Sequence, residues 1–187
     1  MLPAMRTMRA WWPELATAVV ASMLAAGHVA AAPAVVPATL HDVRGDLVDV
    51  AALASRERLV FVTVKATSCP VCRTQLERLG RLLPHLRACG ATFVVLVPGP
   101  NDAVAAIARE TSFPYPFVAD DAVPIAAAAG FAAGNGELVP GFFTVDAARS
   151  VVWQQRGRGA GAFGDGELMA HLGCKAPSES DLLAFAR

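Results

Sequence analysis

Two cysteines separated by two residues are the part of this sequence best suited to chemistry. Cys69 and Cys72 enclose Pro70 and Val71, and they follow the apolar run 59–64. Two thiols at this spacing can close a small disulfide and reopen it, because a thiolate attacks disulfide sulfur. The pattern predicts reversible dithiol chemistry; a structural bridge or half of a metal site are the alternatives.

The elements around this pair indicate different roles for the two sulfurs. The run 59–64 predicts a strand buried on both faces, and a helix is expected from about Pro70, since proline is tolerated in a first helical turn. Cys69 would then lie at the positive end of the helix dipole, which stabilises a thiolate, so we predict that it is the nucleophile. Cys72, one turn later on the apolar face, is the predicted resolving cysteine.

A second candidate for the site is Pro140, directly before the apolar run 142–145. A proline at the start of a strand removes one ladder donor and can adopt the cis form. If it lies beside Cys69, the backbone of Val139 could pair with an extended substrate segment as an added strand. We therefore expect Pro140 in the catalytic site, and Pro70, Val71 and Val139 in the substrate-binding surface.

The order of the expected elements indicates the fold class. Strands separated by helices need crossover connections and give a parallel core, and a closing hairpin adds antiparallel strands. This predicts an α/β fold, a three-layer sandwich with a central mixed sheet. The expected strands are 59–64, 92–97, 142–145 and 151–155; the expected helices begin at about residues 70, 103, 123 and 166; and a small hairpin is expected at 39–50.

Several residues predict where these elements begin, bend or end. Pro84 should kink the long helix or divide it, and Gly90 should end it. Asn101 or Asp102 can cap the next helix, and Asp165 can cap the last one. Residues 134–136 are expected to form a loop.

Bulk composition limits the function classes. The chain has 187 residues, 55% of them apolar, and a formal net charge of zero. This length suits one domain, and the lack of a basic excess predicts that no nucleic acid is bound. We expect no metal and no cofactor, because the chain has a lone CxxC with no histidine at ligand spacing.

The N-terminus has the layout of a secretory signal peptide. Arg6 and Arg9 supply a positive region, residues 15–26 an apolar region, and residues 29–31 the small side chains that precede cleavage before Ala32. An uncleaved anchor, which would tether the chain to a membrane, is the alternative. Either way, a periplasmic or otherwise extracytoplasmic location is expected, either secreted or membrane-tethered.

The other two cysteines, Cys89 and Cys174, also survive cleavage. Cys89 falls near the apolar face of the long helix and could be a small core residue. A Cys89–Cys174 disulfide is the alternative, because export places the chain in an oxidising compartment.

The strand that ends in Cys69-Pro70-Val71-Cys72, the two crossovers and the strand after Pro140 resemble the thioredoxin superfamily. The added element 117–131 and the hairpin around Gly45 narrow the resemblance to the redoxin branch, with the AhpC/TSA peroxiredoxins and the exported TlpA-type thioredoxins. The resemblance implies a thioredoxin-like fold, a redox-active Cys69–Cys72 pair and a cis Val139–Pro140 bond. Together with the N-terminal pattern, it predicts a signal peptide or uncleaved anchor (1–31), a linker (32–38), a redoxin domain (39–174) and a tail (175–187).

The chain departs from these relatives at several positions near the cysteines. Ser68 replaces the typical tryptophan, and Thr63 replaces the buried carboxylate of cytosolic thioredoxins. Lys65 could favour a thiolate or could simply be solvated. The peroxiredoxin motif Pro-x-x-x-Thr-x-x-Cys fails in both registers, where its Pro and Thr fall on Val62 and Ala66, or on Lys65 and Cys69.

These observations lead to a first hypothesis, an exported thiol–disulfide oxidoreductase that acts on protein disulfides and dithiols. Its electrons must come from, or pass to, another exported or membrane partner. A thiol-dependent peroxidase is the second hypothesis, and a non-catalytic maturation partner with a redoxin fold is the third. The sequence does not distinguish the reductive from the oxidative direction.

Overall fold

The computed structural model describes residues 35–119, 121–158 and 164–175. The chain divides into residues 1–31 and residues 32–187, and every described residue lies in the second unit. The predicted signal peptide is therefore outside the described residues, as is the predicted tail beyond Lys175. Across the described ranges, no helix is both long and apolar enough to cross a membrane.

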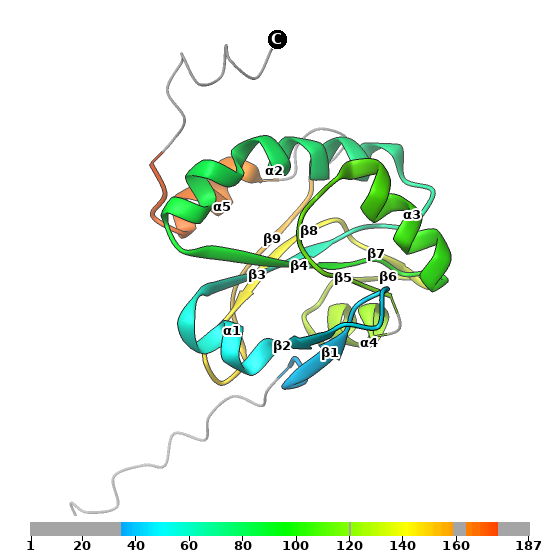
Figure 1. Ribbon diagram of the computed structural model, residues 1–187, viewed down its shortest axis with the longest axis horizontal. Coiled ribbons are helices and arrows are strands. Elements are labelled where there is room, and N and C mark those ends of the chain that lie inside the picture. The colour runs from blue at the N-terminus through cyan, green and yellow to red at the C-terminus, as the bar shows by residue number, and fades with distance from the viewer. Residues whose placement is uncertain (1–34, 120, 159–163, 176–187) are drawn as a thin grey trace, which may run out of the picture. The chain divides into compact units, whose positions relative to one another are not determined.

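A five-stranded mixed sheet forms the centre of the fold (Figure 1). Its strands, in spatial order, are β5 (Phe117–Val118), β4 (Ala91–Leu96), β3 (Arg58–Thr63), β8 (Gly141–Val145) and β9 (Val151–Arg156). β3, β4 and β5 are parallel, whereas β8 runs antiparallel to β3 and β9 antiparallel to β8. The predicted parallel core with a closing antiparallel pair is confirmed.

Helices cover both faces of this sheet, which confirms the three-layer α/β sandwich (Figure 1). On one face lie α2 (Pro70–Ala88), α3 (Asn101–Thr111) and α5 (Asp165–His171), and on the other lie α1 (Val50–Arg56) and α4 (Ala122–Ala128). Along β3, Val60 and Val62 pack into the core under α2, whereas Leu59 and Phe61 pack into the opposite core. Burial on both faces explains the continuous apolar run of this strand.

Two small hairpins lie outside the central sheet. The predicted N-terminal hairpin is present as β1 (Thr39–His41) and β2 (Leu47–Asp49), and Gly45 adopts a φ of 83° in its turn. The second hairpin, β6 (Ala132–Gly134) and β7 (Glu137–Leu138), was not predicted, because residues 134–136 were expected to form only a loop. Its short strands are too small to show a period-two pattern.

The N-terminal edge of the fold begins before Thr39. Val36, in the predicted linker, is 2% exposed and packs into the core beside α1 and α4. The backbone N–H of Val35 donates to the carbonyl of Arg149 at 3.0 Å. The strand connection after β8 therefore helps to hold this segment.

Of the two effects predicted for Pro84, a kink or a division of the helix, the division is wrong, because α2 continues through Pro84 as one helix. A proline inside a helix costs about 3 kcal/mol, but burying a leucine side chain contributes about 1.5–3 kcal/mol. Leu79, Leu83 and Leu86 all lie buried on one stripe around Pro84. Keeping this stripe against the sheet outweighs the lost hydrogen bond. The helix ends at Ala88, and Gly90 follows with a φ of 76°, as predicted.

Two predicted helix caps are wrong. α3 begins at Asn101 with Pro100 at the N-cap position, so neither Asn101 nor Asp102 is the N-cap residue, although the Asp102 carboxylate accepts from the backbone N–H of Ala103 at 2.8 Å. α5 begins at Asp165 with Gly164 as its N-cap, so the Asp165 carboxylate does not cap the helix. Instead this carboxylate is buried and forms an ion pair with Arg78 of α2. Burial raises the pKa of Asp165, and the charge of Arg78 opposes that shift.

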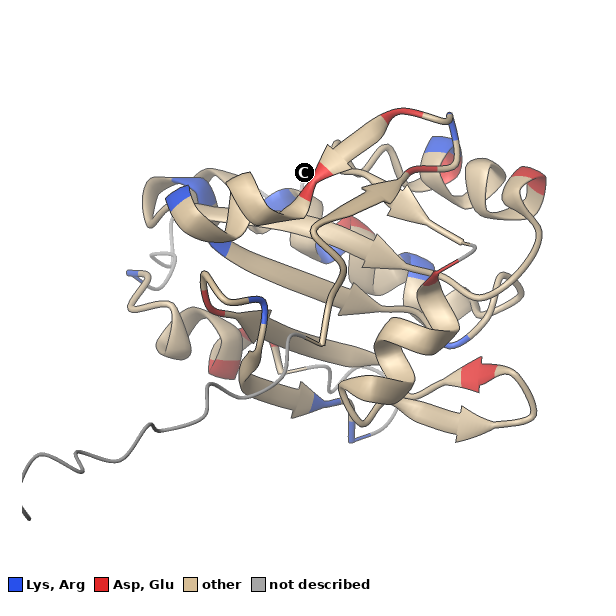
Figure 2. Cartoon of the chain, turned by 90° about the horizontal axis from the view of Figure 1, so that it is seen from below, with Lys and Arg blue, Asp and Glu red and all other residues tan. Residues whose placement is uncertain are grey.

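Charged residues of both signs are interspersed over the visible elements in Figure 2.

Candidate active site

The two cysteines of the CxxC motif are joined by a disulfide at the start of α2, with their Cα atoms 5.4 Å apart. Cys69 is the N-cap residue of α2, and its Sγ accepts a hydrogen bond from the backbone N–H of Cys72 at 3.2 Å. The unpaired N–H groups of the first turn and the helix dipole both favour negative charge there. This position stabilises a Cys69 thiolate once the disulfide is reduced.

The two sulfurs differ in how far they are buried. Cys72 is 1% exposed, whereas Cys69 is only partly buried against the core. An external disulfide can therefore approach Cys69 far more easily than Cys72. The predicted roles of nucleophile and resolving cysteine require this asymmetry.

A pocket of about 450 Å³ lies over the disulfide. It is lined by Lys65, Ala66, Ser68, Cys69, Pro70, Val71, Cys72, Glu137, Pro140 and Gly157. The fold thus gathers five of the six residues that the sequence predicted for the site. Val139, the sixth, packs instead against the core beside α1 and α4.

The Val139–Pro140 peptide bond is trans, since no cis bond occurs among the described residues, and the predicted cis bond is wrong. Hydrogen bonds hold the trans segment. The N–H of Val139 donates to the carbonyl of Phe131 at 2.7 Å, and the Pro140 carbonyl accepts from the N–H of Gly157 at 2.7 Å. Val139 therefore has no free backbone donor for an added substrate strand in this conformation.

Thr63 lies where cytosolic thioredoxins place a buried carboxylate. Its hydroxyl is within hydrogen-bonding distance of the carbonyls of Val139, at 2.7 Å, and Gly141, at 3.3 Å. The single hydroxyl proton is directed to these carbonyls, so Thr63 stabilises the Pro140 segment, and a neutral hydroxyl lacks the basicity of the carboxylate that it replaces.

Glu137 is a pocket residue that sequence reasoning missed, because the β6–β7 hairpin that carries it was not predicted. Its carboxylate lies 3.4 Å from the ammonium of Lys65, and the two side chains are 35% and 49% exposed. The charge of Lys65, left open between solvation and thiolate stabilisation, is thus paired with a carboxylate at the pocket rim. The one sequence signal for a place of Glu137 in the pocket was its position three residues before Pro140, which was itself predicted to lie in the site.

Arg73 holds the loop that leads to Cys69, and the sequence did not indicate this role. Its guanidinium donates to the carbonyl of Thr67 at 3.0 Å and to the carboxylate of Glu110 on α3 at 2.8 Å. The Thr67 side chain also packs against Gly99. A Cβ atom at position 99 would lie only 2.8 Å from the Thr67 methyl group, so the close approach requires glycine there. These contacts fix the path of the chain two residues before the nucleophile.

The second cysteine pair is also bridged. Cys89 and Cys174 form a disulfide with a Cα–Cα distance of 5.5 Å and a sequence separation of 85 residues. Of the two possibilities left open for Cys89, the structure has the bridge and not an unpaired core residue. Cys89 follows the last residue of α2, so 16 helical residues (73–88), a rise of about 25 Å, lie between it and Cys72.

Another polar contact, made by His171, lies outside the residues that line the CxxC pocket. His171 of α5 stacks on Trp153 with ring centroids 4.4 Å apart, and its Nε2 lies 3.0 Å from the hydroxyl of Thr144. Burial, and then the charge of Arg58, lower the pKa of His171. Among the described residues, no cluster of three or more His, Cys, Asp or Glu side chains could hold a metal.

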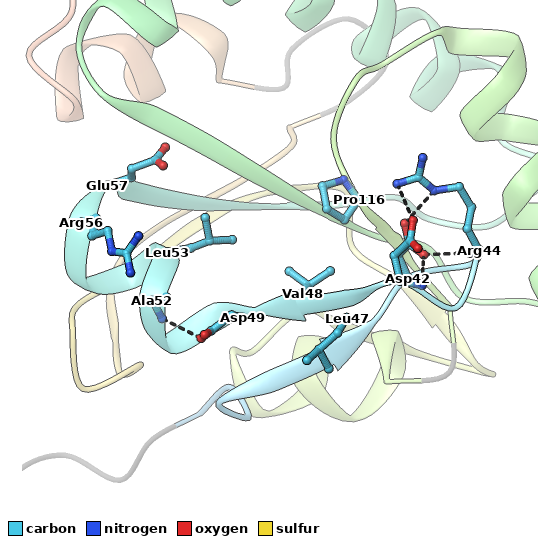
Figure 3. A pocket seen from close by; sticks show the side chains of 11 residues that line it. Asp42, Arg44, Leu47, Val48, Asp49, Ala52, Leu53, Arg56, Glu57 and Pro116 are labelled. Carbon is cyan, nitrogen blue, oxygen red and sulfur yellow. Dashed lines mark hydrogen bonds and ion pairs between the residues drawn. The ribbon is translucent and has the colours of Figure 1, made fainter.

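A second pocket, of about 340 Å³, opens between the N-terminal hairpin and α1 (Figure 3). The buried carboxylate of Asp42 accepts hydrogen bonds there from the backbone N–H groups of Arg44 and Asp46 and from the Arg44 guanidinium. This carboxylate therefore organises the hairpin turn. No cysteine lines this pocket.

Solved structures with similar folds include peroxiredoxins and a disulfide oxidoreductase. The peroxidoxin BcpB from Mycobacterium tuberculosis is 22% identical, with 72% of this chain and 90% of that chain covered and a TM-score of 0.59. The bacterioferritin comigratory protein of Xanthomonas campestris is 18% identical, with 72% and 89% covered and a TM-score of 0.61. A secreted disulfide oxidoreductase of Mycobacterium tuberculosis, homologous to Escherichia coli DsbE, is 18% identical, with 72% and 93% covered and a TM-score of 0.56.

These likenesses show the thioredoxin-like fold. No curated protein matches the chain. The Redoxin family model matches residues 29–163, which is more than half of the sequence. The chain therefore belongs to the Redoxin family, a thioredoxin-like family of thiol-dependent oxidoreductases.

Proposed function

We propose that this chain is an exported thiol–disulfide oxidoreductase that exchanges disulfides with other proteins through Cys69 and Cys72. The observation that carries the proposal is the asymmetric disulfide at the start of α2, which lines the pocket with Cys69 partly exposed and Cys72 buried. The predicted signal peptide supports export, which would place the redox partner outside the cytoplasm or in a membrane.

In the reductive direction, the Cys69 thiolate attacks one sulfur of a substrate disulfide. A bond forms between Cys69 and that sulfur, and the other substrate sulfur leaves as a thiolate that takes a proton. Cys72 then loses its proton and attacks Cys69, which restores the Cys69–Cys72 bond and releases the second substrate sulfur. The substrate gains two electrons and two protons, and an external dithiol must reduce the chain again. The oxidative direction reverses these steps.

A thiol-dependent peroxidase is the second candidate, because peroxiredoxins are among the proteins of similar fold. Peroxide cleavage needs hydrogen-bond donors preorganised around the peroxide oxygens. With Cys69 as the attacking residue, the motif positions are held by Val62, which is buried in the core, and Ala66. Neither side chain has a donor, and this favours disulfide exchange.

A comparison of the reaction rates with two oxidants tests this choice. Fully reduced protein is mixed separately with hydrogen peroxide and with a peptide disulfide, and the closure of Cys69–Cys72 is followed by quenched alkylation. We expect the disulfide to react faster by at least about tenfold, which is a barrier difference of about 1.4 kcal/mol.

Protein alkylated at Cys69 is the control and should react with neither oxidant. Rapid, sustained peroxide consumption with a slow reaction toward disulfides would establish the peroxidase instead. If neither oxidant reacts, the non-catalytic partner becomes the better explanation.

A further inference from the structure

The buried face of α2 carries one polar side chain that the fold does not explain. Gln75 is 1% exposed, and neither its amide nitrogen nor its amide oxygen has a hydrogen-bond partner. Buried polar atoms are almost always paired, since an unmade hydrogen bond costs the full desolvation of the group. Within the described ranges, only Asp165 also has such atoms, and its charge is met by Arg78.

The position of Gln75 relates it to the CxxC pair. It lies three residues after Cys72 on the same helix, where side chains are neighbours with Cβ atoms about 5–6 Å apart. Helical side chains lean toward the N-terminus, over the preceding turn, and for Gln75 the preceding turn is the one that contains Cys72. Both side chains belong to the buried set of α2.

The hydrogen-bonding need of Cys72 changes with its redox state. In the disulfide its sulfur carries neither a proton nor a charge. Reduction by an external dithiol breaks the Cys69–Cys72 bond, delivers two electrons and two protons to the pair, and converts the donor to its disulfide. The buried Cys72 sulfur then carries an S–H group, and a negative charge when it attacks. The Thr63 hydroxyl directs its only proton to the Val139 and Gly141 carbonyls, so it has no donor left for a Cys72 thiolate.

We propose that Gln75 is the hydrogen-bond partner of Cys72 in the reduced protein. Its carbonyl oxygen accepts from the Cys72 thiol, and its amide N–H₂ donates to the thiolate that resolves the mixed disulfide. The inference rests on the proposed function, because it requires the Cys69–Cys72 couple to cycle. An amide that is unpaired in the disulfide form and paired in the dithiol form biases the couple toward reduction.

The variant Gln75→Leu tests this bias, because it removes the amide and keeps an apolar side chain of similar volume. Unfolding temperatures are measured for the oxidised and the reduced full chain, and the redox equilibrium is measured in dithiothreitol buffers. We expect the oxidised variant to become more stable and the reduced variant to gain less or to lose stability. The equilibrium should shift toward the disulfide by about five- to tenfold, the worth of one net hydrogen bond.

Gln154→Leu, the same change at an exposed position on β9, is the control and should leave the equilibrium unchanged. Gln75→Met is the second variant, for use if the leucine does not fold. Equal stability changes in both redox states with an unchanged equilibrium would overturn the inference and leave the proposed function intact. A wild-type pair that dithiothreitol cannot cycle would overturn the proposed function itself.

Discussion

Replacing Cys69 by serine is expected to reduce disulfide exchange by about a thousandfold or more, the scale of loss when an enzyme loses its nucleophile. A serine hydroxyl is not ionised at neutral pH and cannot replace a thiolate at the start of α2. Cys72→Ser is expected to behave differently, because Cys69 remains able to attack. This variant should accumulate a mixed disulfide with the substrate, visible on non-reducing gels and located at Cys69 by mass spectrometry.

Ser68→Ala is the matched control, because Ser68 lines the same pocket and carries no thiol. It should retain exchange within a few-fold of the wild-type rate. The roles of the two cysteines would have to be reversed if Cys69→Ser trapped the substrate on Cys72 while Cys72→Ser formed no adduct.

The second large effect concerns stability. Replacing both Cys89 and Cys174 by alanine should lower the free energy of unfolding by about 4 kcal/mol, because the bridge closes a loop of 85 residues. For a domain of this size the loss corresponds to a decrease in Tm of about 10 °C. The double variant avoids leaving one reactive thiol behind. Thermal unfolding of the oxidised proteins measures the difference.

The same double variant tests whether the Cys89–Cys174 disulfide has any role in disulfide exchange. Disulfide exchange through Cys69 should be unchanged at temperatures where the variant is folded, since the length of α2 separates the two bridges. An unchanged Tm together with lost exchange would show that the Cys89–Cys174 pair takes part in the redox chemistry and does not simply stabilise the fold.

Local sequence patterns were sufficient for the main architecture. The apolar run of β3 and the leucine stripe of α2 are long and regular. These two patterns are therefore sufficient to predict a buried strand followed by a helix with one buried face. Cys69 and Cys72 lie at the junction of these two elements, and the position of the site followed from that junction. Pro140 reached the pocket because a strand that pairs with β3 must begin near the end of β3.

Features that depend on contacts between distant residues could not be predicted. The trans Val139–Pro140 segment depends on hydrogen bonds to Phe131, which precedes the β6–β7 hairpin, and to Gly157, which follows β9. Asp165 had the residue type of a helix cap, but its ion pair with Arg78 across two helices determines its orientation. Glu137 was missed because a strand of two residues leaves no periodic signal.

The central claim is that Cys69 and Cys72 form a reversible dithiol–disulfide couple, and a redox titration of the full chain tests it most directly. The protein is equilibrated with mixtures of reduced and oxidised dithiothreitol, quenched by alkylation, and analysed by mass spectrometry for each cysteine. We predict one two-electron transition in which Cys69 and Cys72 open together while Cys89 and Cys174 remain bridged. A chain in which the Cys69–Cys72 bond does not open, or opens only after the Cys89–Cys174 bond, would contradict this claim.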